Sequence, residues 1–168
     1  HGSLRAALEA RGWPTLASAR GRVVFVLLDR AGKTRAYTRD FTGLEGRAMF
    51  ANAEPPQFDE RWAAFAKIDD PTAAATIGAA IERRIMVGSN VCAAGRERSE
   101  CATRLLHGLR NGVHMLKDDF PGPTEERDWS LRFPNDAPFR CNPVTGADTC
   151  REDDLDENWT VVSHGGPG

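Results

Sequence analysis

Five short runs of apolar residues recur along the chain, and each ends in polar or charged side chains. The first, Gly21–Asp29, is apolar at every position from Val23 to Leu28. Such continuous runs are typical of parallel strands that are buried on both faces. The other four runs are Arg47–Asn52, Ala63–Asp70, Ile85–Asn90 and Val113–Asp119. Because sites in parallel α/β folds lie beyond the carboxyl ends of the strands, we expect the functional surface at these five endings.

Amphipathic segments between these runs predict helices. The connection over residues 34–46 is too short and too polar for a full crossover helix. The alternation of strands and helices indicates a parallel sheet with right-handed crossovers. The expected helices are Ser3–Arg11 (capped by Ser3, stopped by Gly12), Ala73–Arg84 (with Asp70 as its N-cap) and Arg96–Arg110 (ended by Asn111-Gly112 as a left-handed C-cap).

The number of strands limits the fold class. Five strands do not close an eight-stranded barrel, and Arg20-Gly21-Arg22 precedes a strand instead of forming a phosphate loop that opens a helix. We therefore expect an α/β fold that is the C-terminal part, about five β/α units, of a TIM-type (β/α)8 barrel. Residues 1–151 would form this partial barrel with a terminal disulfide loop and a short strand at Trp129–Phe133, and residues 152–168 an acidic, glycine-rich, disordered tail.

Bulk properties exclude several classes of protein. The net charge of −2 and the pI near 6.1 give no reason to expect a nucleic-acid partner. No apolar run reaches the roughly 20 residues that a membrane-spanning helix needs. A length of 168 residues suits one domain.

The four cysteines lie in two pairs with the same spacing of nine positions, Cys92 with Cys101 and Cys141 with Cys150. This spacing suggests two local disulfides and hence a secreted or extracytoplasmic protein, although four cysteines allow three connectivities. Free thiols in a cytosolic enzyme are the alternative. A zinc site is disfavoured, because neither pair has the tight spacing of zinc ligands.

Polar residues at the strand endings are the candidates for a binding site. Lys67 interrupts an apolar strand, where an unpaired ammonium is costly, so it either faces a phosphate or pairs with Asp69 or Asp118. Asp29 could bind a sugar hydroxyl or ligate calcium, and is a weak metal candidate. No histidine is placed for catalysis: His107 lies in a helix and His114 early in its strand. The substrate-binding candidates are Asp29, Asn52, Lys67, Ser89, Lys117 and Asp118.

Several stretches, in this order and spacing, resemble the calcium-dependent phosphoinositide-specific phospholipase C family. They cover about residues 3–151, and the most specific are the lead-in to the first strand and the terminal cysteine loop. The stretches are GWPTLASARGRVVFVLLD (12–29), GRAMFANAEP (46–55), AAFAKIDDP (63–71), GVHMLKDDFP (112–121) and FRCNPVTGADTC (139–150).

The resemblance implies a phospholipase C-like phosphodiesterase barrel of which these are the fourth to eighth strands. It implies an enzyme that cleaves phosphatidylinositol-like lipids to diacylglycerol and inositol phosphate, with histidines as acid and base and Ca²⁺ stabilising the phosphate charge. The catalytic histidines and most calcium ligands are expected on the first strands, outside this chain, so the isolated chain is expected to be inactive. In place of the arginine-rich ending usual on the penultimate strand, this chain has Val87-Gly88-Ser89-Asn90.

Three interpretations remain open. In the first, the chain supplies the headgroup-binding half of such an enzyme, with a phosphoinositide or other phosphodiester as substrate, a transient membrane surface, and the N-terminal half of the barrel as its partner. A glycerophosphodiester phosphodiesterase-like enzyme is the alternative within this class. In the second, it is a catalytically inactive headgroup-binding module. In the third, it is an inert fragment whose first strand is an open edge that self-associates.

Overall fold

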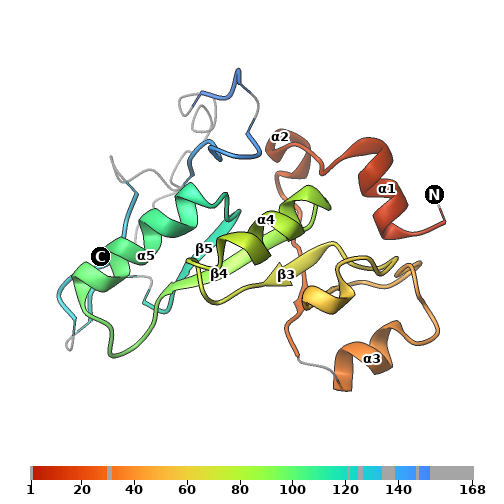
Figure 1. Cartoon of the computed structure of the whole chain (residues 1–168), viewed down its shortest axis with the longest axis horizontal. Helices are drawn as coiled ribbons and strands as arrows, with labels where there is room; N and C mark the ends of the chain where they lie inside the picture. Colours follow the sequence, from red (N-terminus) through yellow and green to blue (C-terminus); the bar gives the residue numbers. More distant parts are fainter. Residues whose placement is uncertain are drawn as a thin grey trace, which may run out of the picture.

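The computed structural model describes residues 2–29, 32–120, 122–124, 127–133, 139–146 and 148–151. Within these residues helices alternate with short strands, as the hydrophobic pattern predicts (Figure 1). In chain order the elements are α1 (Leu4–Arg11), α2 (Leu16–Ala19), β1 (Val26–Leu27), α3 (Gly32–Thr38), β2 (Phe50–Ala51), the 3₁₀ turn η1 (Pro55–Gln57), β3 (Phe65–Lys67), α4 (Ala74–Glu82), β4 (Met86–Cys92), α5 (Arg98–Arg110) and β5 (Met115–Asp118).

All the strand pairs are parallel, which confirms the mixed α/β arrangement. β1 pairs with β2, and β3, β4 and β5 form a three-stranded sheet in that order. A single bridge between Asn52 and Phe65 joins the two groups, so that the strands lie side by side in chain order. The described part of the chain forms an open arrangement, in which no pairing of β1 with β5 closes a barrel.

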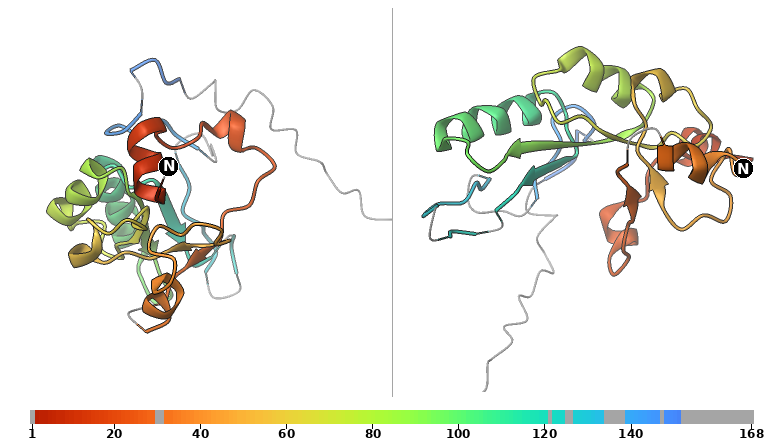
Figure 2. Two further views of the ribbon diagram at one scale, coloured as in Figure 1. Left: turned by 90° about the vertical axis from the view of Figure 1, so that its right-hand side faces the viewer. Right: turned by 90° about the horizontal axis from the view of Figure 1, so that it is seen from below.

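The core lies between the sheet and the two longest helices that cover it. Helices α4 and α5 lie on the same side of β3, β4 and β5 (Figure 2, right). Ile77 of α4 and Val87 of β4 are fully buried in this layer. Val87 has Val91 on the same face of β4, and Val91 packs near Gly108 of α5. This face of the sheet is therefore the helix-covered face.

Local capping explains where the helices begin and end. The Oγ of Ser3 accepts the amide N–H of Ala6 at 3.1 Å, and Gly12 ends α1 with a φ of +70°, as predicted. Gly112, with a φ of +77°, follows α5 in the expected left-handed conformation. The prediction of Asp70 as the N-cap of α4 is wrong. Asp70 accepts hydrogen bonds from Thr72, and the cap position is held by Ala73.

Two other predictions need correction, and one short helix was not predicted. The first apolar run is not buried on both faces: only Val26–Leu27 forms a strand, and Val23 and Phe25 are 74% and 59% exposed. The reason is that β1 has β2 as its one strand neighbour in the described chain, and burial of a strand on both faces needs a covering layer on each side. The connection after β1 holds the short helix α3. Residues 129–133 form no strand.

Both expected disulfides are present, Cys92–Cys101 and Cys141–Cys150. The first disulfide is buried, because both of its cysteines are at most 1% exposed. It links the last residue of β4 to the beginning of α5. The second closes the loop that follows residue 139. Disulfides of this kind are typical of oxidising compartments. None of the described helices is long and apolar enough to cross a membrane. The expected tail, residues 152–168, lies outside the described residues.

Candidate functional site

The strand register decides which polar side chains share a face of the sheet. Lys67 of β3 is level with Gly88 of β4, and Asn90 of β4 is level with Lys117 of β5. Because side chains alternate along a strand, Lys67, Asn90 and Lys117 belong to one face, and the bridge of Asn52 to Phe65 adds Asn52 to it. This is the face opposite α4 and α5. We call its polar end, at the carboxyl ends of β2 to β5, the polar rim.

Asn52 and Lys67 lie together in one cavity of the polar rim. The cavity, about 270 Å³, is also lined by Leu28, Glu54, Asp69 and Thr76, so it extends past the carboxyl ends of the strands to the beginning of α4. The Oδ1 of Asn52 accepts the backbone N–H of Lys67 at 2.6 Å, so this buried amide fixes the end of β3 against the end of β2. The Lys67 ammonium lies 3.0 Å from the Asp69 carboxylate, which confirms one of the two pairings expected from the sequence.

A second polar group lies on the next two strands, β4 and β5, on the same face. Lys117 donates to the Oδ1 of Asp119 at 2.6 Å, and the Nδ2 of Asn90 donates to the same oxygen at 3.2 Å. The bond from Lys117 holds the pKa of the Asp119 carboxyl below its usual range. Asn90 and Asp119 were not among the predicted site residues. Their position in a polar strand ending is a signal that the sequence does contain.

Two of the predicted substrate-binding residues, Ser89 and Asp118, are not on this face. Ser89 is 2% exposed and shares the helix-covered face with Val87 and Val91. Asp118 is turned away from Lys117 and forms a bidentate ion pair with Arg127. The polar rim therefore collects Asn52, Lys67 and Lys117, while alternation along the strands places the other two elsewhere.

Asp29 contacts residues of the segment that directly follows β1, and not the polar rim. Its carboxylate pairs with the ammonium of Lys33 at 2.7 Å, and its backbone carbonyl accepts the hydroxyl of Thr34 at 2.9 Å. The bond to Asp29 raises the pKa of Lys33. Asp29 thus stabilises the beginning of α3.

Arg104 of α5 supports the polar rim from the helix-covered side of the sheet. Nothing in the sequence pattern distinguishes it from other helix arginines. Its Nη2 donates to the backbone carbonyls of Asp69 at 2.8 Å and of Asn90 at 3.0 Å. These carbonyls belong to the two segments that carry the rim side chains. Because one planar guanidinium bonds both, the side chain fixes the spacing between the ends of β3 and β4.

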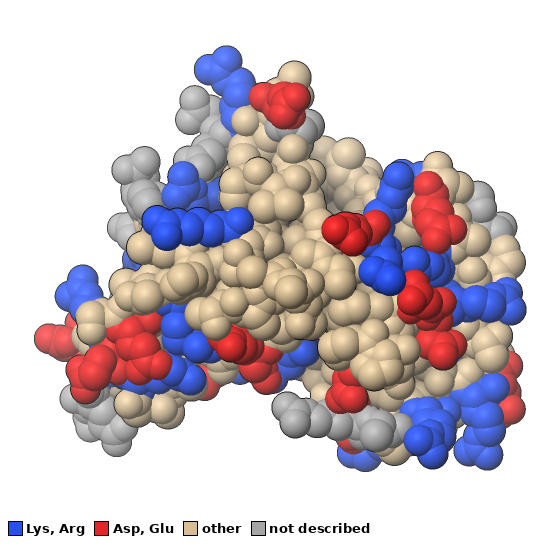
Figure 3. Space-filling model, in the orientation of Figure 1, with Lys and Arg blue, Asp and Glu red and all other residues tan. Residues whose placement is uncertain are grey.

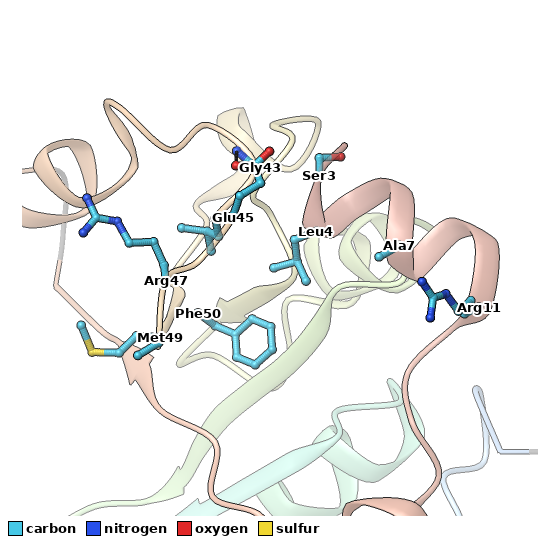
Figure 4. A pocket seen from close by; sticks show the side chains of 11 residues that line it. Ser3, Leu4, Ala7, Arg11, Gly43, Glu45, Arg47, Met49 and Phe50 are labelled. Atoms are coloured by element: carbon cyan, nitrogen blue, oxygen red, sulfur yellow. Dashed lines mark hydrogen bonds between the residues drawn. The ribbon is translucent and has the colours of Figure 1, made fainter. Parts of the chain in front are cut away.

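A larger cavity, about 420 Å³, lies at the opposite edge of the sheet, between α1 and residues 43–50. In Figure 4, Leu4 and Phe50 point toward each other inside it, and Arg11 and Arg47 lie at its margins. Phe50 is the first residue of β2, so this cavity is at the amino end of the strands. That edge serves stability in parallel α/β folds, and the polar rim is the better site candidate.

The comparison with protein families decides the identity of the chain. The model of the calcium-dependent phosphoinositide phospholipase C family matches residues 1–143. The chain belongs to this family. No curated protein and no solved structure gives a significant match. Members of this phospholipase C family are phosphodiesterases.

The family is calcium-dependent, and the described residues do not fit a calcium site by themselves. Calcium takes six to eight oxygen ligands, which usually include several carboxylates. Among the described residues no group of three or more acidic, histidine or cysteine side chains could hold a metal. Asp69 and Asp119 of the polar rim are each paired with a lysine, and Asp29 is paired as well. Glu54, in the lining of the same cavity, adds one further carboxylate.

The described histidines lie away from the polar rim. His107 is in the middle of α5. His114 precedes β5, where its Nδ1 accepts the N–H of Val87 at 3.0 Å and its Nε2 lies 3.3 Å from the hydroxyl of Thr145. Burial lowers the pKa of His114, so the ring is a neutral structural link between β4 and the loop closed by Cys141 and Cys150.

Proposed function

We propose that this chain supplies the headgroup-binding part of a phospholipase C-type phosphodiesterase. The reaction is the cleavage of phosphatidylinositol-like lipids to diacylglycerol and inositol phosphate. The observation that carries the proposal is the convergence of Asn52 and Lys67 in one cavity at the carboxyl ends of β1, β2 and β3. Family membership supports the phosphodiester as the class of substrate.

The polar rim offers the chemistry that a sugar phosphate needs. The side chain of Lys67 is 32% exposed and its ammonium has three donors, so it can bind a phosphate oxygen while it stays close to Asp69. Lys117 of β5 lies two strand spacings away, which is about 10 Å, with Asp119 just beyond it, and Asn90 lies on the strand between. They present donors and an acceptor to the hydroxyl groups of a ring. A headgroup bound between the two groups would thus have its charge at Lys67 and its hydroxyls at Asp119.

In this proposal the acid–base chemistry and calcium binding belong to residues other than those of the polar rim. The rim has no histidine among its described residues, and its carboxylates Asp69 and Asp119 are each paired with a lysine. Calcium, held by acidic residues elsewhere in the complete enzyme, would supply stabilisation of the phosphate charge. The two disulfides support a secreted or extracytoplasmic location for that enzyme.

Binding of myo-inositol 1-phosphate to the full chain, followed by NMR titration, tests the headgroup role. We expect Lys67→Met to weaken binding roughly tenfold or more, because a hydrogen bond to a charged group contributes about 1.5–3 kcal/mol. Lys33→Met is the matched control, since Lys33 pairs with Asp29 outside the cavity. Equal binding by all three proteins would contradict the proposal. If wild type binds glycerol 3-phosphate more tightly than myo-inositol 1-phosphate, the glycerophosphodiester alternative is favoured.

Hydrolysis separates an enzyme part from an inactive binding module. We expect no release of inositol phosphate from phosphatidylinositol vesicles by this chain alone. A longer natural form that contains it should release inositol phosphate with calcium and not with chelator. If the longer form binds myo-inositol 1-phosphate and releases none from the lipid, the inactive-module interpretation replaces the enzyme.

A further inference from the structure

An apolar groove with arginines at its margin lies between α5 and residues 129–132. Its volume is about 460 Å³. The floor includes Leu105, Leu106 and Leu109 from one side of α5, and Leu106 is 51% exposed. The described lining residues include three arginines, Arg98, Arg132 and Arg140, and no acidic residue. A groove of this kind favours a partner that carries both carboxylates and apolar side chains.

The side of the groove formed by residues 129–132, called its wall below, is held in place by several contacts. Trp129 lines it and lies against the guanidinium of Arg127, whose carbon is 3.6 Å from the centre of the indole ring. The backbone N–H of Leu131 donates to the Oδ2 of Asp118 at 3.2 Å. Through Asp118, the segment that forms this wall is attached to the end of β5. In Figure 3 uncharged side chains cover much of the centre of the view, and charged side chains lie around them.

The sequence that follows the described residues has the matching chemistry. Directly after Arg151 come five carboxylates within six positions, in the segment Glu152–Glu157. Leu155 is among them, and Trp159, Val161 and Val162 follow. Carboxylates next to arginines at a partly desolvated margin gain charge-assisted hydrogen bonds, and the apolar side chains would cover the leucines of the floor.

The covalent structure brings this segment to the end of the groove. Arg140 lines the groove and precedes Cys141, which is bonded to Cys150, two residues before Glu152. From Leu109 to Arg98 the groove follows eleven residues of α5, which is about 16 Å at 1.5 Å per residue. Five extended residues cover the same length, at about 3.3 Å each. The segment is thus long enough to reach every arginine of the margin.

We propose that residues 152–162 of this chain dock in the groove between α5 and residues 129–132. The arginines of the margin bind the carboxylates of Glu152–Glu157, and the leucines of α5 are covered by Leu155 and Trp159. Because the segment is tethered beside the groove, its effective concentration there is of millimolar order, and a weak intrinsic affinity is enough for docking. A segment too polar to fold by itself orders on such a surface. Docking braces the wall that Asp118 attaches to β5.

Fluorine NMR of the full chain labelled with 5-fluorotryptophan tests this proposal, because the chain has four tryptophans and two of them report on docking. Trp159 lies in the docking segment, and Trp129 lies in the groove. The triple variant Asp153→Lys, Asp154→Lys, Asp156→Lys should move the Trp159 signal to its position in a free peptide of residues 152–168. The Trp129 signal should shift as well, while Trp13 and Trp62 stay in place.

Two further variants make the test specific. Leu106→Glu puts a carboxylate on the exposed floor of the groove and should release the segment in the same way. The control is Asp40→Lys, Glu60→Lys, Glu82→Lys, which makes the same change in net charge at residues outside the groove and should leave both signals unchanged. Raising the salt concentration from 50 to 500 mM should move the wild-type signals toward those of the triple variant, since the screening length falls to a few ångströms.

Three results would overturn the proposal. The first is a wild-type Trp159 signal already at the free-peptide position. The second is a Trp129 signal that depends on protein concentration, which would make a second copy of the chain the occupant. The third is a Trp129 signal that ignores the tail variant and shifts only with phosphatidylserine vesicles, which would make an anionic membrane the occupant.

Discussion

Asp118 and Arg127 form a bidentate ion pair, with Oδ1–Nη1 and Oδ2–Nη2 distances of 2.9 and 2.7 Å. The two side chains are only 14% and 8% exposed. Asp118 also accepts the backbone N–H groups of Phe120 and Leu131. This one carboxylate therefore attaches the irregular segment after β5 to the sheet, and it is a structural residue of the helix-covered side.

Replacement of Asp118 by Asn should be strongly destabilising. Removal of one partner of a buried ion pair leaves an unpaired charge and costs about 3–5 kcal/mol. Denaturant unfolding of Asp118→Asn should show a loss of this order in the free energy of unfolding. Asp128→Asn, which changes an exposed carboxylate in the same segment, should be nearly neutral.

The effect of Asp118 should also depend on pH. Burial alone would raise the pKa of this carboxyl, but the hydrogen bonds from Arg127, Phe120 and Leu131 outweigh burial and hold the pKa below its usual range. Its stabilising effect is therefore full above pH of about 4 and is lost as the pH falls through the lowered pKa. A difference between wild type and Asp118→Asn that stays constant from pH 6 to pH 2 would contradict this assignment.

His114 should make the protein less stable in mild acid. Its Nδ1 accepts the N–H of Val87, so the neutral ring is required, and burial lowers the pKa of the ring. Because the unfolded chain then binds the proton at a higher pH, stability is full above about pH 6.5 and decreases as the pH falls below that value. Thermal unfolding at pH 7.5 and 5.5 should show this loss in wild type and in His107→Gln, and a smaller loss in His114→Gln. Equal losses in all three proteins would exclude His114 as the cause.

Two helical glycines should respond in opposite directions to replacement by alanine. A Cβ at Gly108 of α5 would meet the Cδ2 of Leu116, whereas a Cβ at Gly78 of α4 meets no atom within 4 Å. Gly108→Ala should cost about 1–3 kcal/mol, since overpacking moves α5 away from β5. Gly78→Ala should stabilise by about 0.5–1 kcal/mol through helix propensity. Calorimetry of the two variants measures both effects, and a stabilised Gly108→Ala would contradict the close packing of α5 on β5.

Of the two disulfides, Cys92–Cys101 should contribute more to global stability. It is fully buried between β4 and α5, whereas Cys141 and Cys150 are half-buried in a loop. Replacement of Cys92 and Cys101 by alanine should cost about 2–4 kcal/mol in denaturant unfolding. Replacement of the other pair should cost less and loosen mainly the loop around Thr145. A larger loss from the second pair would show that this loop is part of the folding core.

The sequence predicted the presence and order of the helices and strands better than it predicted their first and last residues or their burial. The alternation of strands and helices, the caps at Ser3 and Gly112, and both cysteine pairs follow from local chemistry and are confirmed. The burial of Val23 to Leu28 was predicted wrongly because the apolar run does not show what lies beside it. The short helix α3 was missed because residues 32–38 are mostly polar, and it is held by contacts such as that of Thr34 with the carbonyl of Asp29.

For the candidate site, the sequence by itself determined which strand endings carry polar groups, and the polar rim does form at these endings. Only the tertiary structure decided which of those groups share a face. Register places Lys67 with Asn52 and Lys117 with Asn90, and alternation sends Ser89 and Asp118 to the helix-covered side. The physical reason is that a strand has a period of two, so one residue of register exchanges the faces. The partners of Asp118 and the role of Arg104 depend on contacts between distant segments, which no local pattern contains.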